Sequence, residues 1–145
     1  MKIYISGKIG DISDPADEQA AIEKFASAQD LLESLGLEVE NPLNNGLPHN
    51  APWIRHLGRD LEILDGCDGI FMLRDWKMSR GAGHEFDFAN RENKIVTFEA
   101  DVIKTNQDVL QIQAAIQEAT GMRFDQYITK SRKRDGLFAR MLFVY

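Results

Sequence analysis

The chain has 145 residues and a formal net charge of -6, with 43% hydrophobic and 28% charged residues, as is typical of a globular domain with a sizeable core. Its apolar runs are far too short to span a bilayer and its N-terminus lacks a signal-peptide cleavage pattern, so neither a membrane partner nor secretion is expected. The single cysteine, Cys67, excludes an intrachain disulfide, and no Cys/His cluster has zinc spacing. We therefore expect a cytoplasmic protein without a metal ion or cofactor.

Short β-rich segments alternate with helical periodicity through the first hundred residues. In chain order we expect a strand at 2–6, a helix from Asp14-Pro15 to Gly36, a strand at 37–40, a helix at 53–64, a strand at 69–73, a helix at 81–91 and a strand at 94–99. The helical residues expected in the core include Ile22, Phe25, Ala28, Leu32, Leu35 and Trp53. The alternation predicts an α/β, Rossmann/flavodoxin-like three-layer sandwich over residues 1–100, with a parallel sheet of four or five strands.

Residues 101–145 have a different character. Helical patterns at 108–119 and 131–144 predict a helical C-terminal extension. Residues 121–145 hold six Lys/Arg and two Asp, a net charge of +4, which leaves -10 for residues 1–120. Nucleic acid is therefore not an expected partner of the body, and only the tail is a candidate for such contact. The simpler interpretation is that the last helix packs on the body or on a second subunit.

Two carboxylates are predicted on apolar helix faces. Asp60 falls on the apolar stripe of the 53–64 helix, where an unpaired carboxylate is costly and needs a partner or a function. A cap or a salt bridge to a neighbouring loop explains Asp60 equally well. Glu85 also faces inward on its helix, although a glutamate near a helix start commonly pairs with the helix dipole. Paired inward carboxylates at the ligand-binding edge of a sheet suit cleavage at an anomeric carbon.

The segment Ser79-Arg80-Gly81-Ala82-Gly83-His84-Glu85 connects a buried strand to the helix that carries Glu85. Its glycines allow a ligand to approach the backbone closely, and the first helical turn offers N–H groups to an anion. We expect Glu85 to stay ionised at this positive helix end, where it can attack an electrophilic carbon. The loop at residues 7–10 is expected at the same edge of the sheet.

Three segments carry a family resemblance over roughly residues 1–100. They are Ile3-Tyr4-Ile5-Ser6-Gly7-Lys8-Ile9, Arg59-Asp60-Leu61-Glu62-Ile63-Leu64 and the Ser79–Glu85 segment. Together they resemble the nucleoside 2-deoxyribosyltransferase superfamily and, within it, the 2'-deoxynucleoside 5'-phosphate N-hydrolases. The resemblance implies a homodimer or higher homo-oligomer that cleaves the N-glycosidic bond of a deoxynucleotide or deoxynucleoside. The reaction would be hydrolysis or deoxyribosyl transfer through a covalent glycosyl-glutamate intermediate.

The same resemblance implies a role for each matching position. Glu85 would be the nucleophile toward C1' of the deoxyribose, and Asp60 would orient or activate the sugar and assist departure of the base. Tyr4 would line the sugar site. The residues implied on the phosphate side are Gly7, Lys8, Ser79, Gly81 and Gly83, and the serine favours a 5'-monophosphate over a free nucleoside. Trp76 either stacks on the base or covers the edge of the sheet.

The tail carries a second, partial resemblance. Ile128-Thr129-Lys130-Ser131-Arg132-Lys133-Arg134 and Leu137-Phe138-Ala139-Arg140-Met141-Leu142 resemble the basic loop and first helix of the DNA-binding domain in the bacterial chromosomal replication initiator. That domain also needs a second, recognition helix to enter the major groove. The alternative to an enzyme is therefore a non-catalytic nucleotide-binding regulator whose tail contacts nucleic acid.

Overall fold

The computed structural model describes residues 1–102, 114 and 118. The chain divides into two compact units, Met1–Phe98 and Glu99–Tyr145, and the sheet belongs to the first. Of the helix expected at 108–119, only Ala114 and Glu118 are described, and both are helical. The helix expected at 131–144 and the basic tail lie outside the described residues. Within the described part of the chain, no helix has the length and apolar character needed to cross a bilayer.

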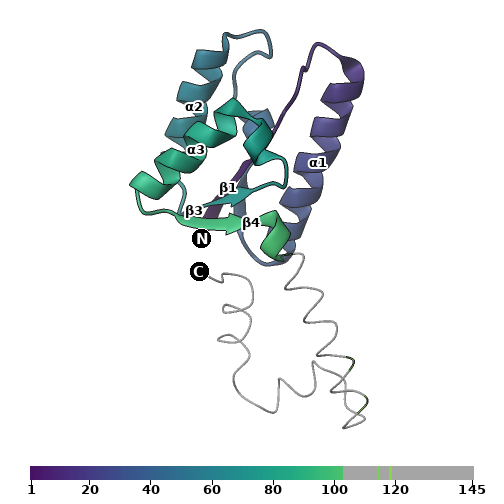
Figure 1. Ribbon diagram of the computed structural model, residues 1–145, viewed down its shortest axis with the longest axis vertical. Coiled ribbons are helices and arrows are strands. Elements are labelled where there is room, and N and C mark those ends of the chain that lie inside the picture. Colours follow the sequence, from purple (N-terminus) through teal and green to yellow (C-terminus); the bar gives the residue numbers. More distant parts are fainter. Residues whose placement is uncertain (103–113, 115–117, 119–145) are drawn as a thin grey trace. The chain divides into compact units, whose positions relative to one another are not determined.

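A four-stranded, all-parallel sheet forms the centre of the first unit. Its strands are β1 (Lys2–Ser6), β2 (Glu38–Glu40), β3 (Gly69–Met72) and β4 (Ile95–Phe98), in the order β2-β1-β3-β4. The helices are α1 (Pro15–Ser34), α2 (Trp53–Asp65) and α3 (Arg80–Arg91), and two 3-10 turns are η1 (Pro42–Asn44) and η2 (Trp76–Met78). In Figure 1, α1 lies on one side of the sheet and α2 and α3 lie together on the other. The predicted α/β sandwich is confirmed, with four strands.

Capping groups that are visible in the sequence set the helix boundaries. Asp14 accepts a hydrogen bond from the Ala16 N–H at 2.9 Å at the start of α1, and Gly36, with φ of +82°, turns the chain after its end. At the start of α3, the Ser79 hydroxyl accepts a hydrogen bond from the Ala82 N–H at 3.2 Å. The expected helix boundaries therefore agree with the structure to within two residues.

The core lies around the two central strands, β1 and β3. Their fully buried side chains include Tyr4, Ile5, Ser6, Ile70 and Phe71. On α1, Phe25, Ala28 and Leu32 are buried as expected, together with Ala21. These four follow the i, i+4, i+7, i+11 row that faces the sheet.

Three residues expected in the core are exposed instead. Ile22 lies one position away from the buried row of α1 and is 46% exposed, and Leu35 lies beyond the last turn of that helix. Trp53, the first residue of α2, is 43% exposed, and Arg80 Cζ lies 4.5 Å from the centroid of its ring. Hydrophobic spacing identified the helices correctly but did not distinguish neighbouring positions at the border of the buried face.

The chain connections diverge between β1 and β3. From β1 the chain proceeds to β2 at one edge, and then crosses back to β3 on the other side of β1. In open parallel sheets, ligands bind beyond the carboxyl ends of the strands at such a switch point. Here the loop after β1 and the segment after β3 come together, and the Leu73 N–H donates to the Ser6 carbonyl at 2.8 Å. The crevice beyond the carboxyl ends of β1 and β3 is therefore the expected ligand site.

Gly7 gives the first prediction, because it packs directly against the end of β3. A Cβ at this position would lie 2.8 Å from Leu73 Cδ1 and 3.1 Å from Asp75 Oδ1. We expect Gly7→Ala to lower the free energy of unfolding by about 1–3 kcal/mol, because a buried side chain must move. Urea denaturation monitored by circular dichroism measures this change.

Gly58→Ala is the matched control, because Gly58 lies within α2 and a Cβ there meets nothing within 4 Å. This variant should be neutral or more stable by up to about 1 kcal/mol. An unchanged midpoint for Gly7→Ala would contradict the tight packing described at this position.

Candidate active site

Glu85 is held at the floor of the crevice by two hydroxyl groups of the central strand. Tyr4 Oη donates to Glu85 Oε1 at 2.9 Å, and Ser6 Oγ donates to Glu85 Oε2. Tyr4 and Ser6 are two residues apart, so their side chains leave the same face of β1. Glu85 itself is only 6% exposed and lies on the buried face of α3 with Ala82 and Ala89. Each carboxylate oxygen thus has its own donor.

Burial changes the protonation of Glu85. The pKa of its carboxyl group is raised to about 7, mainly because burial removes solvent. The hydrogen bond from Ser6 lowers the pKa, the charge of Asp60 raises it, and the hydrogen bond from Tyr4 lowers it. The expectation that the helix end keeps Glu85 fully ionised is therefore wrong. Glu85 lies beyond the first turn of α3, where the dipole effect has faded, and desolvation outweighs the two hydroxyl donors.

Asp60 is the second buried carboxylate, and an amide side chain holds it. Asn45 Nδ2 donates to Asp60 Oδ1 at 2.9 Å, and both residues are almost fully buried. The side-chain oxygen of Asn45, Oδ1, accepts a hydrogen bond from the Leu47 N–H at 3.0 Å, and this bond fixes the orientation of the side-chain amide. Burial raises the pKa of Asp60 to about 6, and the Asn45 hydrogen bond opposes this shift. A loop amide, rather than the cap or salt bridge weighed from the sequence, is its partner among the described residues.

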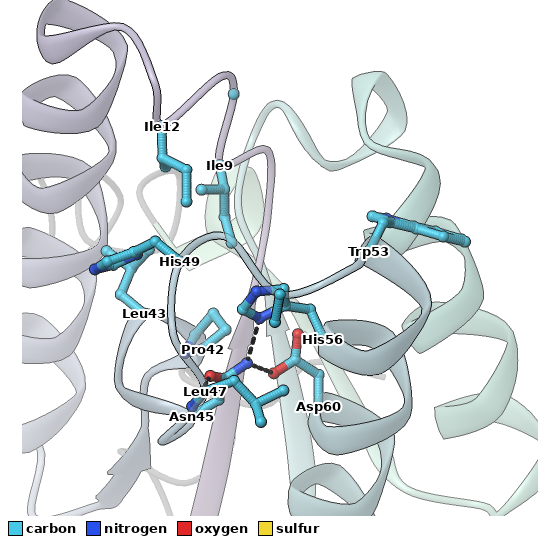
Figure 2. A pocket seen from close by; sticks show the side chains of 12 residues that line it. Ile9, Ile12, Pro42, Leu43, Asn45, Leu47, His49, Trp53, His56 and Asp60 are labelled. Atoms are coloured by element: carbon cyan, nitrogen blue, oxygen red, sulfur yellow. Dashed lines mark hydrogen bonds between the residues drawn. The ribbon is translucent and has the colours of Figure 1, made fainter.

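The two carboxylates open onto a cleft with two connected lobes. The acidic lobe is a cavity of about 270 Å³ that contains Glu85, and its further lining includes Gly7, Lys8, Ser79, Gly81 and Ala82. The apolar lobe, about 250 Å³ and drawn in Figure 2, is lined in addition by Ile12, Leu43, Asn45, Leu47, His49 and Ala51. Both lobes share Ile9, Gly10, Pro42, Trp53, His56 and Asp60. Asp60 therefore lies at the junction of the two lobes.

The cleft brings together most of the residues predicted from the sequence. Glu85, Asp60 and the phosphate-side candidates Gly7, Lys8, Ser79 and Gly81 all line the acidic lobe. The paired carboxylates come from α3 and α2, and the phosphate-side candidates come from the loop after β1 and from the start of α3. Residues separated by almost eighty positions in the chain therefore share one cavity.

Three predicted residues do not line the cleft. Tyr4 is completely buried beneath it and reaches it only through its hydrogen bond to Glu85. The Gly83 N–H donates to the Ser79 carbonyl at 3.1 Å within the helix, so it is not available to an anion. Trp76 packs against Phe86, with ring centroids 4.7 Å apart, and against Phe98 at 6.1 Å, so it covers the edge of the sheet. Of the two interpretations of Trp76, the structure supports packing.

Several polar residues that support the site were not identified in the sequence. Ser6 could have been found, because strand alternation places it on the same face as Tyr4. Asn45 lies in an irregular loop, where no periodicity indicates its direction. Lys24 and Asp75 also support the site. Lys24 Nζ forms a salt bridge with Asp75 Oδ2 at 2.6 Å, and Asp75 Oδ1 accepts a hydrogen bond from the Lys8 N–H at 3.0 Å, which anchors the loop after β1. That bridge joins elements distant in sequence, and no local pattern predicts it.

The fold and the cleft define an α/β protein with two buried carboxylates at the switch point of a parallel sheet. The family model described as "Domain of unknown function (DUF4406)" matches residues 1–98, which is the whole of the first compact unit. The chain therefore belongs to the DUF4406 family. No curated protein matches the sequence. In the described part of the chain, no group of three or more His, Cys, Asp or Glu side chains is placed to hold a metal ion.

The raised pKa of Glu85 gives a prediction for stability. An ordinary glutamate has a pKa of 4.5, so between that pH and about 7 the folded protein binds a proton that the unfolded chain lacks. The free energy of unfolding should fall as the pH rises through this window. Glu85→Gln is neutral at every pH, so we expect it to match the parent below pH ~4.5 and to exceed it by about 1–3 kcal/mol above pH ~7.

Urea unfolding at pH values from 4 to 8 measures this difference. Asp87→Asn, an exposed position on the same helix, is the control and should change stability little at any pH. A Glu85→Gln variant that is less stable than the parent at pH 8 would show that the ionised carboxylate is well accommodated, contrary to the burial argument.

Proposed function

We propose that this protein cleaves the N-glycosidic bond of 2'-deoxynucleoside 5'-monophosphates through a covalent intermediate on Glu85. The observation that carries the proposal is the pair of hydrogen bonds from Tyr4 and Ser6, which fixes the Glu85 carboxylate in the same cavity as Asp60. A fixed carboxylate next to a second one is the arrangement used for displacement at an anomeric carbon. The resemblance of three sequence segments to deoxyribosyltransferase-like proteins agrees with this chemistry.

In the first step, a Glu85 carboxylate oxygen attacks C1' of the deoxyribose. A C1'–O bond forms, the C1'–N bond breaks, and its electron pair leaves with the base, which takes up a proton. In the second step, water, or the nitrogen of another base, attacks C1' and releases the glutamate. Tyr4 and Ser6 orient the carboxylate so that a lone pair can face the sugar, which lowers the entropic part of the barrier.

Asp60 is suited to assist both steps. It can orient the sugar for departure of the base, and its raised pKa, about 6, leaves it mostly ionised at neutral pH, where it can accept a proton from the attacking water. Because the charges of Asp60 and Glu85 interact, the two groups titrate as a coupled pair. Asp60 also lies between the two lobes, so a substrate that spans them brings its sugar past both carboxylates.

The acidic lobe contains groups that suit a 5'-phosphate. Lys8 supplies a positive charge, and Ser79 and Gly81 line the lobe at the start of α3, a helix of 12 residues. The positive end of a helix and its first N–H groups favour an anion. These groups support a nucleotide over a free nucleoside as the substrate.

The direct test is release of free base. The protein is incubated with each of the four deoxynucleoside 5'-monophosphates, the matching deoxynucleosides and the ribonucleotides, and the products are separated by chromatography. We expect base from deoxynucleoside monophosphates, and at least a ~100-fold lower kcat for Glu85→Gln and Asp60→Asn. Mass spectrometry of the acid-quenched enzyme should find a deoxyribosyl phosphate adduct on the peptide that contains Glu85. Asp87→Asn is again the control with unchanged activity.

The outcomes separate the alternatives. Base exchange with an added free base would select transfer, and release of base without exchange would select hydrolysis. If no substrate yields base while Glu85→Ala still binds nucleotides normally, the enzyme proposal fails and a non-catalytic nucleotide-binding regulator becomes the better description.

The dependence of kcat on pH tests the hydrogen bond from Ser6. The attacking carboxylate must be ionised, so kcat should rise with an apparent pKa near 7. Ser6→Ala removes a donor that lowers the pKa of Glu85, so we expect the rising limb to move upward by about one pH unit. Ser27→Ala, at an exposed position of α1, should leave the profile unchanged. A Ser6→Ala profile identical to that of the parent would mean that this hydroxyl does not tune Glu85.

A further inference from the structure

The Asn45 side chain has a fixed orientation in the wall of the cleft. The Leu47 N–H can only donate a hydrogen bond, so the Asn45 atom that accepts it at 3.0 Å is the carbonyl oxygen. The amide nitrogen then faces the opposite way, toward Asp60 Oδ1 at 2.9 Å and His56 Nδ1 at 3.1 Å. Its two hydrogens are used by these two acceptors. The backbone therefore decides which way the amide points.

This orientation also decides the tautomer of His56. An amide nitrogen only donates, so His56 Nδ1 must accept and therefore carries no hydrogen. In the neutral ring the proton then lies on Nε2. Figure 2 shows the ring with one nitrogen bonded to Asn45 and the other directed away from Asn45 and Asp60. The contact of Asn45 with Nδ1 thus makes the other ring nitrogen of His56, Nε2, a hydrogen-bond donor.

The donor on His56 has no acceptor within the described residues. His56 Nε2 is buried, and no hydrogen-bond partner is found for it in that part of the chain. Every other buried side-chain nitrogen or oxygen in the described residues has a partner, so this atom is the exception. A buried donor without a partner destabilises a protein, and a ligand that supplies an acceptor would recover this loss once the ring turns its covered Nε2 toward the cleft. The orphan donor belongs to a residue that lines both lobes of the cleft.

The walls of the apolar lobe are mainly apolar. Its additional lining includes Ile12, Leu43 and Leu47 from two different loops, and the charged groups of the acidic lobe are not among it. A small-molecule site of this kind combines apolar walls with a few placed polar groups that set orientation. Asp60 marks the junction with the acidic lobe. A nucleotide that spans both lobes with its ring in the apolar lobe would have its sugar on the acidic side of Asp60.

We propose that the apolar lobe binds the base of the substrate, and that the Nε2–H of His56 selects it by donating to a ring nitrogen or carbonyl oxygen. His56 is then a specificity residue, and Asn45 is the positioning residue that fixes its tautomer. The inference rests on the proposed function for the identity of the ring as a nucleobase. The hydrogen bond itself is a property of binding and does not require turnover.

Binding measurements with paired ligands test the proposal. In the Glu85→Gln background, calorimetry gives Kd for deoxynucleoside monophosphates and for analogues in which a single acceptor is removed or weakened. The probes are dAMP with its 1-, 3- and 7-deaza forms, and dUMP with its 4-thio form, which keeps the N3–H and replaces O4 by a weaker acceptor. For at least one pair, loss of the acceptor should weaken binding by about 5- to 100-fold. Adding His56→Phe should reduce that ratio to less than about 2-fold, and His56→Gln, which keeps a donor, should preserve part of it.

Equal discrimination by the parent and by His56→Phe would overturn the proposal. This result is distinct from failure of the proposed function. If base is released but the ratio of Kd values for paired ligands does not depend on His56, only this inference fails. If that ratio depends on His56 but no base is released, only the proposed chemistry fails. If His56→Phe does not fold, the His56→Gln variant and the next measurement still decide the question.

Nitrogen-15 NMR of the histidine rings reads the tautomer directly in the unliganded protein. At pH 8 we expect His56 protonated at Nε2 and unprotonated at Nδ1. Asn45→Asp places an acceptor beside Nδ1, so it should add a proton there. A ring that stays neutral then loses the Nε2–H and the discrimination between paired ligands, whereas a doubly protonated ring keeps the Nε2–H and the discrimination. His56 protonated at Nδ1 in the parent protein would overturn the proposal.

Discussion

Glu85 is joined to the central strand by the hydroxyl groups of Tyr4 and Ser6, and the rest of the cleft is arranged around this contact. A buried carboxylate is tolerated only where donors replace the water that it has lost. Here both donors come from the buried part of β1, a central strand of the sheet, so the carboxylate is positioned by a rigid element. Ala82 and Ala89 on the same face of α3 are small, which lets that helix approach the strand closely enough for the contact to form.

The second carboxylate is supported in a different way. Asp60 depends on Asn45, a loop residue whose amide is oriented by one backbone N–H and shared with His56. The nucleophile candidate is thus fixed by the sheet, and its partner is fixed by a loop that also forms the wall of the apolar lobe. A change in this loop alters the environment of Asp60 and the shape of the ligand site together. Variation in that loop is therefore a direct route to altered specificity on an unchanged scaffold.

Both carboxylates have raised pKa values because the cleft removes water from them, and for Glu85 also because Asp60 is charged. This arrangement lowers stability at neutral pH and places both groups in the range where protons are exchanged easily. Residues that reduce stability at a site but suit a chemical step are characteristic of functional centres. The buried nitrogen of His56, for which the described residues offer no hydrogen-bond partner, belongs to the same category.

Much of the fold followed from local signals. The Asp14 cap, the glycine at 36 and the spacing of apolar residues placed the strands and helices to within about two residues, and the alternation of elements predicted a parallel sheet. The inward direction of Asp60 and Glu85 was also predicted correctly, because a helical wheel depends only on the regular rotation of 100° per residue. Trp53 and Ile22 were placed wrongly, since the wheel does not show where the partner surface ends.

The sequence by itself therefore determined the elements, their order and the faces on which the two carboxylates lie, because these depend on near neighbours in the chain. Only the tertiary structure decided what those carboxylates touch. The hydroxyl donors to Glu85 come from a strand about eighty residues away, and the amide that orients Asp60 and His56 comes from an irregular loop. Desolvation, pKa and tautomer follow from such contacts between distant segments, so they have no signature in the local pattern of residues.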